Sequence, residues 1–204
     1  MFKRVEHWNN IYETKSPSEV SWTEDYPTYS IEFIESLNLD KSLPIIDIGA
    51  GDSRVVDSLI ELGFNDITVL DISENALNRA KQRLGKISSK IDWISSDILN
   101  FRPKKTYNLW HDRACFHFLT KKEDIDYYKN IVRQNVTNHL LICTFSDTGP
   151  LKCSGLQVTR YSCEKIKKNF EDSFKLTNCK LKIHKTPFNT EQSFIYSSFR
   201  RKIN

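Results

Sequence analysis

Five short runs of apolar residues recur through the middle of the chain, separated by longer segments in which apolar residues return every three or four positions. The runs are nearly continuous, which is typical of strands buried on both faces of a parallel sheet. The segments between them have the period of helices that pack one face against such a sheet. The alternation predicts a doubly wound α/β sheet with right-handed crossovers. The predicted strands are 44–48, 67–72, 91–95, 107–112 and 139–145, and the predicted helices are 54–62, 74–84 and 124–136.

Both ends of the chain depart from this alternation. Residues 174–186 and 191–201 are alternating stretches with no helix between them, which predicts an antiparallel hairpin at the sheet edge. The first forty residues are rich in tryptophan, tyrosine and acids, and we expect helical or irregular structure lying against the sheet. With 204 residues the chain fits one domain, in which residues 1–40 form an N-terminal cap and residues 41–204 the core.

Composition excludes several classes of protein. The net charge is +4 with basic residues scattered among acids, so we expect no nucleic-acid partner. No apolar run approaches the roughly 18 residues of a membrane span, and the N-terminus lacks the apolar core of a secretory signal, so no membrane association is expected. Five cysteines without a Cys-x-x-Cys pair argue against a disulfide framework or a structural zinc site. They favour a reducing, cytoplasmic compartment and no bound metal.

The stretch Ile-Ile-Asp-Ile-Gly-Ala-Gly at residues 45–51 holds two of the six glycines in the chain. The predicted strand ends near Asp47. The turn into the next helix consists of Gly49, Ala50 and Gly51, and a strand, a glycine turn and a helix in this order bind nucleotides. Glycine lets a ligand approach the backbone amides because no side chain stands in the way. A tight turn without a ligand is the alternative.

Two acids at the ends of the next two strands extend this motif. Asp71, followed by Ile72, stands where an acid accepts hydrogen bonds from ribose hydroxyls. Capping of the next helix is the alternative for Asp71, although Ser73 is better placed to cap. Asp97 ends the third strand and can accept from an adenine amino group, while the amide of Ile98 meets a ring nitrogen.

NAD-dependent oxidoreductases share the glycine turn and the ribose acid. Their Gly-x-Gly-x-x-Gly fingerprint needs a third glycine or alanine, and Arg54 stands at that position. No pyrophosphate cradle is completed, so a ligand with an adenosine and no pyrophosphate fits better. A nicotinamide-dependent oxidoreductase is therefore the less favoured alternative.

Together the glycine turn, the two acids and the closing hairpin resemble the class I, seven-stranded S-adenosylmethionine-dependent methyltransferases over nearly the whole chain. The resemblance implies a Rossmann-like sheet in the order 3-2-1-4-5-7-6, with strand 7 antiparallel and a helical N-terminal extension. It also implies S-adenosyl-L-methionine as cofactor, S-adenosyl-L-homocysteine as product, and no metal. The cofactor-binding residues that it implies are Trp22, Asp47, Gly49, Ala50, Gly51, Asp71, Ile72, Asp97 and Ile98.

A narrower resemblance is to bacterial proteins near the thiopurine-methyltransferase-like and citrate-synthase-lysine-methyltransferase-like groups. It is carried by residues 7–12, 19–22, 109–119 and 186–196. It implies a small-molecule or protein-lysine acceptor. A non-catalytic partner subunit that binds S-adenosylmethionine is the alternative.

In this family the residues just past the fourth strand line the methyl-transfer pocket, and the polar residues His111, Asp112 and Arg113 stand there, followed by His117. Asp112 could orient an amine, Arg113 could anchor an anionic acceptor, and His117 could accept a proton near neutral pH. A core histidine at His117 and a structural pair of Asp112 with Arg113 are the alternatives.

Aromatic residues of the N-terminal segment can cover the cofactor, because aromatic faces attract a sulfonium cation. Trp22, with Trp8 and Tyr12, is the candidate for this shield, and ordinary packing on the sheet is the alternative. The long loop at residues 146–156 is a candidate specificity loop.

Overall fold

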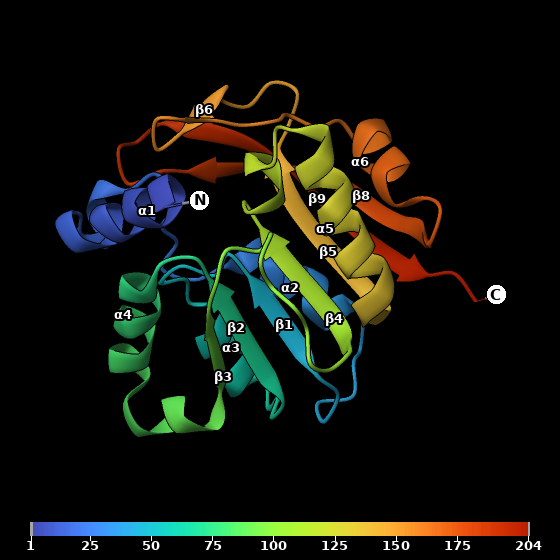
Figure 1. The fold of residues 1–204 in the computed structure, drawn as a ribbon, viewed down its shortest axis with the longest axis horizontal. Helices are drawn as coiled ribbons and strands as arrows, with labels where there is room; N and C mark the ends of the chain where they lie inside the picture. The colour runs from blue at the N-terminus through green and yellow to red at the C-terminus, as the bar shows by residue number, and fades with distance from the viewer. Residues whose placement is uncertain (1, 204) are drawn as a thin grey trace. The chain divides into compact units, whose positions relative to one another are not determined.

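The chain forms a seven-stranded mixed sheet, described for residues 2–203 by a computed structural model (Figure 1). The strand order is β3-β2-β1-β4-β5-β9-β8. Because β8 and β9 are the sixth and seventh strands of this sheet along the chain, the predicted order is confirmed, and β9 runs antiparallel to β5 as expected. The strands are β1 (Ile45–Ile48), β2 (Ile67–Asp71), β3 (Asp92–Ser95), β4 (Tyr107–Arg113), β5 (Val136–Phe145), β8 (Phe174–Lys185) and β9 (Glu191–Arg201), with β6 (Lys152–Cys153) and β7 (Leu156–Gln157) in a separate small hairpin.

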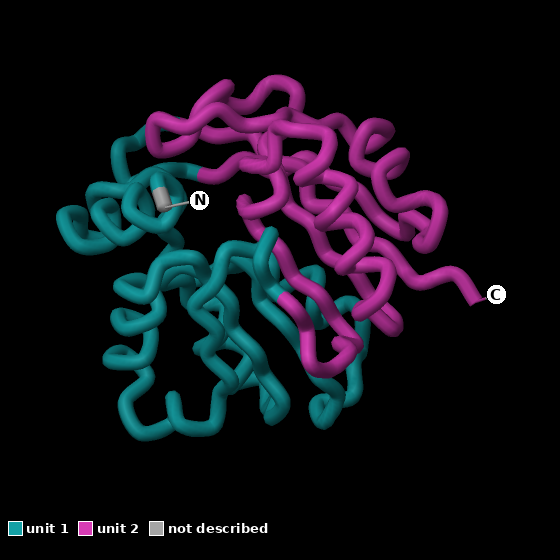
Figure 2. Tube along the Cα trace, viewed as in Figure 1, with its two compact units in different colours: residues 1–101, 185–190 teal, residues 102–184, 191–204 magenta. Residues whose placement is uncertain are grey.

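Two compact units divide the chain, and Figure 2 colours them separately. The N-terminal unit comprises residues 1–101 and 185–190, and the C-terminal unit comprises residues 102–184 and 191–204. The first forty residues belong to the same unit as the first three strands. The division of one domain into a cap of residues 1–40 and a core of residues 41–204 stays a prediction.

The N-terminal unit is a parallel three-stranded sheet with its helices. β1 pairs with β2 and β2 with β3, all parallel, and every residue of β1 and β2 is buried, as their continuous apolar sequence predicts. The helices are α1 (Phe2–Thr14), α2 (Thr28–Ser36), α3 (Val55–Glu61) and α4 (Glu74–Leu84), with 3-10 turns η1 (Pro17–Glu19) and η2 (Gly85–Lys90). The helical N-terminal extension is thus confirmed.

The start of α4 is fixed by Ser73. Its hydroxyl oxygen accepts a hydrogen bond from the amide of Ala76 at 3.2 Å, which satisfies one of the free donors at the helix N-terminus. The helix ends at Gly85, whose φ of 58° favours glycine. The prediction that Ser73, rather than Asp71, caps this helix is confirmed.

The C-terminal unit pairs β4 with β5 in parallel and β5 with β9 in antiparallel fashion. Its helices are α5 (Lys122–Asn135) and α6 (Cys163–Phe170), with a 3-10 turn η3 (Phe116–Phe118). α6 was not predicted, because within it only Ile166 and Phe170 are buried and so few positions give a weak helical pattern. Ser162 caps it by accepting from the Lys165 amide at 3.2 Å.

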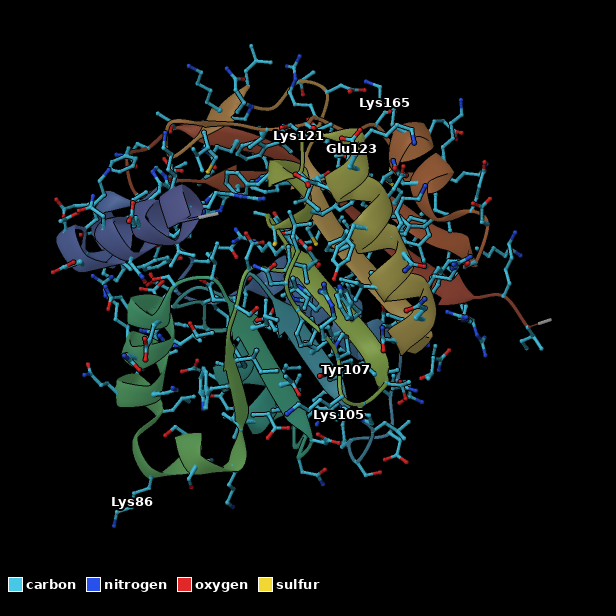
Figure 3. The ribbon with its side chains drawn as sticks, in the orientation of Figure 1. Lys86, Lys105, Tyr107, Lys121, Glu123 and Lys165 are labelled. Atoms are coloured by element: carbon cyan, nitrogen blue, oxygen red, sulfur yellow. A yellow bond between two sulfur atoms is a disulfide. The ribbon has the colours of Figure 1, made fainter. Side chains whose placement is uncertain are left out.

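Both units carry exposed lysines. Lys86 of η2 and Lys165 of α6 are exposed and extend away from the backbone, whereas Tyr107 of β4 is buried (Figure 3). No helix among residues 2–203 has the length and apolar content that a membrane crossing requires.

Two of the five cysteines form a disulfide, which corrects the expectation of reduced cysteines. Cys163, at the start of α6, is bonded to Cys179 of β8, with their Cα atoms 6.0 Å apart. The remaining cysteines, Cys115, Cys143 and Cys153, are free. The expectation was wrong because the two partners are 16 residues apart in no recognisable motif, and only the packing of α6 against the sheet edge brings them together.

Candidate cofactor site and acceptor residues

The glycine turn after β1 is tied to the end of β2. Gly49 and Gly51 have φ values of 63° and 58°, a region that favours glycine. The amide of Gly51 donates to Asp71 Oδ2 at 2.8 Å, and the amide of Ala50 donates to the carbonyl oxygen of Leu70 at 3.1 Å. The turn is therefore held against the adjacent strand with its backbone shape fixed.

Asp71 lies at the centre of this arrangement. It is 5% exposed, and its Oδ1 accepts from the amide of Ser73 at 2.7 Å while Oδ2 accepts from Gly51. Burial raises the pKa of this carboxyl, and the two backbone hydrogen bonds lower it by a smaller amount, so that the pKa is about 6. Each carboxylate oxygen has two acceptor positions, so one position on each remains after these two bonds. Two positions on one carboxylate match the two hydroxyls of a ribose.

Asp97, after β3, is also buried, at 6% exposure. Its Oδ1 accepts from the amide of Leu99 at 3.0 Å, and its Oδ2 lies 3.7 Å from Nε of Arg4 in α1. Ile98 beside it is buried, Asp47 in β1 is buried, and Ile72 after β2 is half-buried. All predicted cofactor residues thus belong to the N-terminal unit, at the carboxyl ends of its three parallel strands or in its N-terminal segment.

An aromatic cluster of Trp8, Tyr12 and Trp22 lies directly on the glycine turn. The Trp22 ring centroid is 5.9 Å from that of Trp8 and 6.2 Å from that of Tyr12. A methyl group built at Gly51 would lie 2.2 Å from the Tyr12 hydroxyl oxygen, so Gly51 is required by Tyr12 itself. Tyr12 was grouped with the predicted shield but not among the predicted cofactor-binding residues.

Tyr12 is 7% exposed, and its hydroxyl is hydrogen-bonded to the Trp22 side chain, whose indole can only donate. Burial, followed by the negative charge of Asp71, raises the pKa of Tyr12 well above its ordinary value. The phenol therefore stays neutral and can offer its own proton to an acceptor. The spacing of Trp8 and Tyr12, one helical turn apart, was the available signal that both face the same way.

In the C-terminal unit, Asp112 is completely buried and its oxygens are engaged. They accept from the amides of Cys115 at 2.9 Å and Phe116 at 3.1 Å and from the hydroxyl of Tyr128 at 2.5 Å. Burial raises the pKa of Asp112 to about 6, against these hydrogen bonds, which lower it. The carboxylate thereby holds the turn after β4, in which Ala114 has a φ of 67°.

Arg113 and His117 flank this turn. Nε of Arg113 donates to the Tyr196 hydroxyl at 3.2 Å, and its guanidinium lies 5.5 Å from the Phe194 ring centroid. His117 is completely buried, and its Nδ1 accepts from the Phe145 amide at 3.2 Å, so the neutral ring carries its proton on Nε2. Burial, with a smaller effect of the Arg113 charge, lowers the pKa of His117 to about 3. The acceptor roles of Asp112, Arg113 and His117 stay predictions.

Within residues 2–203, no three His, Cys, Asp or Glu side chains gather as metal ligands.

Comparison with known proteins agrees with this geometry. Residues 45–135 match the family model described as a methyltransferase domain. A stretch of 128 residues, 61% of this chain and 18% of the relative, is 24% identical to the eEF1A lysine and N-terminal methyltransferase of Mus musculus. The chain thus spans about a fifth of the length of the curated relatives that it matches.

Solved structures share the fold over almost the whole chain. The N-methyltransferase NodS of Bradyrhizobium japonicum, in complex with S-adenosyl-L-homocysteine, has a TM-score of 0.71 at 16% identity, over 97% of this chain and 100% of that one. Magnesium protoporphyrin IX methyltransferase of Synechocystis, also with bound S-adenosyl-L-homocysteine, has a TM-score of 0.67 at 13% identity, over 98% and 94%. The chain thus has the fold of these methyltransferases, and residues 45–135, which hold its strand, glycine-turn and ribose-acid motifs, are similar to a methyltransferase domain.

Proposed function

We propose that this protein transfers a methyl group from S-adenosyl-L-methionine to an acceptor and releases S-adenosyl-L-homocysteine. The observation that carries the proposal is the pairing of Asp71 with the glycine turn. The buried carboxylate is fixed by two backbone amides and keeps one acceptor position on each oxygen, which fits the two hydroxyls of a ribose.

The residues of the N-terminal unit divide the work of binding. The turn at Gly49, Ala50 and Gly51 offers its backbone, Asp71 with Ile72 holds the ribose, and Asp97 with Ile98 meets the adenine. Asp47 supports the turn from the end of β1, and Trp22 shields the cofactor from water. The bound cofactor supplies an activated methyl group, so the protein mainly aligns, desolvates and orients the reactants.

We propose an amine as the acceptor, on a small molecule or a protein lysine. The name of the mouse relative states methylation of lysine and of an N-terminus, and the name of the NodS structure states N-methyl transfer. Because its oxygens are engaged by the turn, Asp112 would act by positioning that turn, and Arg113 and His117 remain the candidates for direct contact.

The non-catalytic and oxidoreductase alternatives are separated by binding and turnover. Calorimetry should show binding of S-adenosylmethionine and S-adenosylhomocysteine and none of NAD. Transfer of label from S-adenosylmethionine to a panel of small amines or to lysate proteins then distinguishes an enzyme from a cofactor-binding subunit. Tight binding of NAD would overturn the proposal.

The residue-level test is Asp71→Ala. Loss of two charge-assisted hydrogen bonds should cost about 2–4 kcal/mol of cofactor binding. Glu61→Ala, which removes an exposed acid at the end of α3, is the matched control and should bind as the wild type does. Unchanged affinity in Asp71→Ala would remove the ribose assignment.

A further inference from the structure

A chain of hydrogen bonds joins the ribose acid to the N-terminal helix. The amide of Ser73 donates to Asp71 Oδ1 at 2.7 Å, and the Ser73 hydroxyl donates to Oδ1 of Asn9 in α1 at 2.8 Å. The side-chain amide of Asn75 donates to the backbone carbonyl of Asn9 at 3.2 Å. Ser73 is fully buried, so α1 is fixed to the same residue that fixes Asp71.

Arg79 of α4 makes a second connection, at the other end of α1. Its Nη2 donates to the carbonyl oxygen of Lys15 at 2.7 Å. The amide of Lys15 in turn donates a hydrogen bond to the carbonyl oxygen of Ile11 at 2.9 Å, which closes the last turn of α1. A cation there satisfies a free carbonyl and complements the helix dipole. Nη1 of the same guanidinium lies 3.4 Å from the carboxylate of Asp52, the residue after Gly51.

α4 also binds the backbone that follows the glycine turn. Arg83 donates to the carbonyl oxygens of Asp52 and Ser53, each at 2.8 Å, and pairs with Asp57 of α3 at 2.7 Å. One helix therefore fixes the backbone beyond the turn with Arg83 and fixes α1 with Ser73, Asn75 and Arg79.

Between these attachments lies Tyr12, which α1 presses onto Gly51. The Arg79 guanidinium lies 5.8 Å from the Tyr12 ring centroid, and the Tyr12 hydroxyl occupies the space over the Gly51 Cα. We propose that α4 latches α1 over the cofactor site, with Arg79 and Asn9 as positioning residues that act through Tyr12. This inference rests on the proposed function and deepens it, because it says what sets the residence time of the cofactor.

A latch makes a specific kinetic prediction. If α1 must be closed for tight binding, the apparent affinity scales with the closed fraction of molecules. Opening the latch should therefore speed release of S-adenosylhomocysteine by about tenfold and leave contacts of Asp71 with the ribose intact. Release can be followed by stopped-flow fluorescence, because Trp8 and Trp22 lie beside Tyr12.

The experiment compares five variants with the wild type, four single and one double. Arg79→Ala opens the latch from α4, and Asn9→Ala opens it from α1, so the test does not depend on one variant folding. Lys81→Ala removes a cation from α4 that lies 5.7 Å from the Trp93 ring and is the charge-matched control. Tyr12→Ala, alone and combined with Arg79→Ala, completes a double-mutant cycle.

Faster release in Arg79→Ala and Asn9→Ala, a normal rate in Lys81→Ala, and no further effect of Arg79→Ala in the Tyr12→Ala background would support the latch. Wild-type release rates in both latch variants, or additive effects of Arg79→Ala and Tyr12→Ala, would overturn it while leaving the proposed function intact. A wild type that does not bind S-adenosylhomocysteine would overturn the proposed function and the latch together.

Discussion

Replacing Asp112 by alanine tests whether this residue builds the turn after β4 or holds the acceptor. The change removes the acceptor of three donors: the amides of Cys115 and Phe116 and the hydroxyl of Tyr128. Hydrogen bonds to a charged group contribute about 1.5–3 kcal/mol each, so their loss costs about 4–9 kcal/mol. Burial of the ionised carboxylate, the main cause of the rise in its pKa from 3.8 to about 6, offsets part of this at neutral pH. Asp112→Ala should therefore lower the free energy of unfolding by about 2–6 kcal/mol.

The same pKa gives the prediction a pH signature. The folded pKa lies above the unfolded value, so the folded state holds the proton more tightly, and stability falls as the pH rises through about 6. The stability difference between wild type and Asp112→Ala should be larger at pH 4.5 than at pH 7.5, by about 2 kcal/mol. Asp71, whose pKa is also raised to about 6, makes the same pH-dependent contribution in the wild type and in the variant, so it cancels when their stabilities are subtracted.

Urea denaturation at both pH values measures these quantities, and Asp126→Ala, which removes an exposed acid of α5, is the control. Its ion pair with Lys122 is exposed, so its loss should change stability by less than about 1 kcal/mol. An Asp112→Ala variant with the unfolding midpoint of the wild type and no turnover would refute the structural reasoning. That result would return Asp112 to a direct role at the acceptor.

Three further predictions concern the turn, the disulfide and the buried histidine. Gly51→Ala should destabilise the apo protein by about 2–4 kcal/mol, because alanine is strained in the left-handed backbone conformation and its methyl group clashes with Tyr12. In a Tyr12→Ala background, the loss of stability measured by urea denaturation should shrink to the contribution of the backbone strain. Equal losses in both backgrounds would exclude the contact with Tyr12. Reduction of the bond between Cys163 and Cys179 should lower the free energy of unfolding by about 3 kcal/mol. A reductant should not change the stability of Cys163→Ser. If a reductant leaves the stability of the wild type unchanged, the bond is not formed. Because burial lowers the pKa of His117 to about 3, His117→Ala should lower the melting temperature and leave turnover unchanged, whereas a loss of turnover of about 100-fold at neutral pH would show that the imidazole takes a proton.

The parallel sheet could be predicted because the sequences of its central strands are mostly apolar, whereas the order of the strands followed from the resemblance to the methyltransferases. β1 and β2 consist mostly of apolar residues and are buried along their whole length. Strands of this kind are typical of a parallel sheet that is covered by helices on both faces. The start of β5 was placed too late because Thr137 and Asn138 are polar and exposed or half-buried there, so the strand reads as a loop until His139. Pairing with neighbouring strands decides where a strand begins, and the two polar residues Thr137 and Asn138 do not reveal that pairing in the sequence.

The cofactor residues could be predicted because they follow strand ends at fixed spacings. The link between Gly51 and Asp71 is of this kind, since parallel neighbouring strands place their carboxyl ends at one edge. The contact of Tyr12 with Gly51 could not be predicted, because it depends on the angle at which α1 meets the sheet. The full engagement of Asp112 depends similarly on Tyr128 of α5, because its hydroxyl donates to Asp112 only when the helix packs in this position.

The bond between Cys163 and Cys179 turns the segment between them into a covalent ring. A protease that cuts the exposed backbone at Glu171 or Asp172 would open this ring without releasing either half of the chain. On a gel without reductant the nicked protein would run as one species, and with reductant it would separate into two. Limited proteolysis followed by both gels thus maps the connection between α6 and β8 without any variant at all.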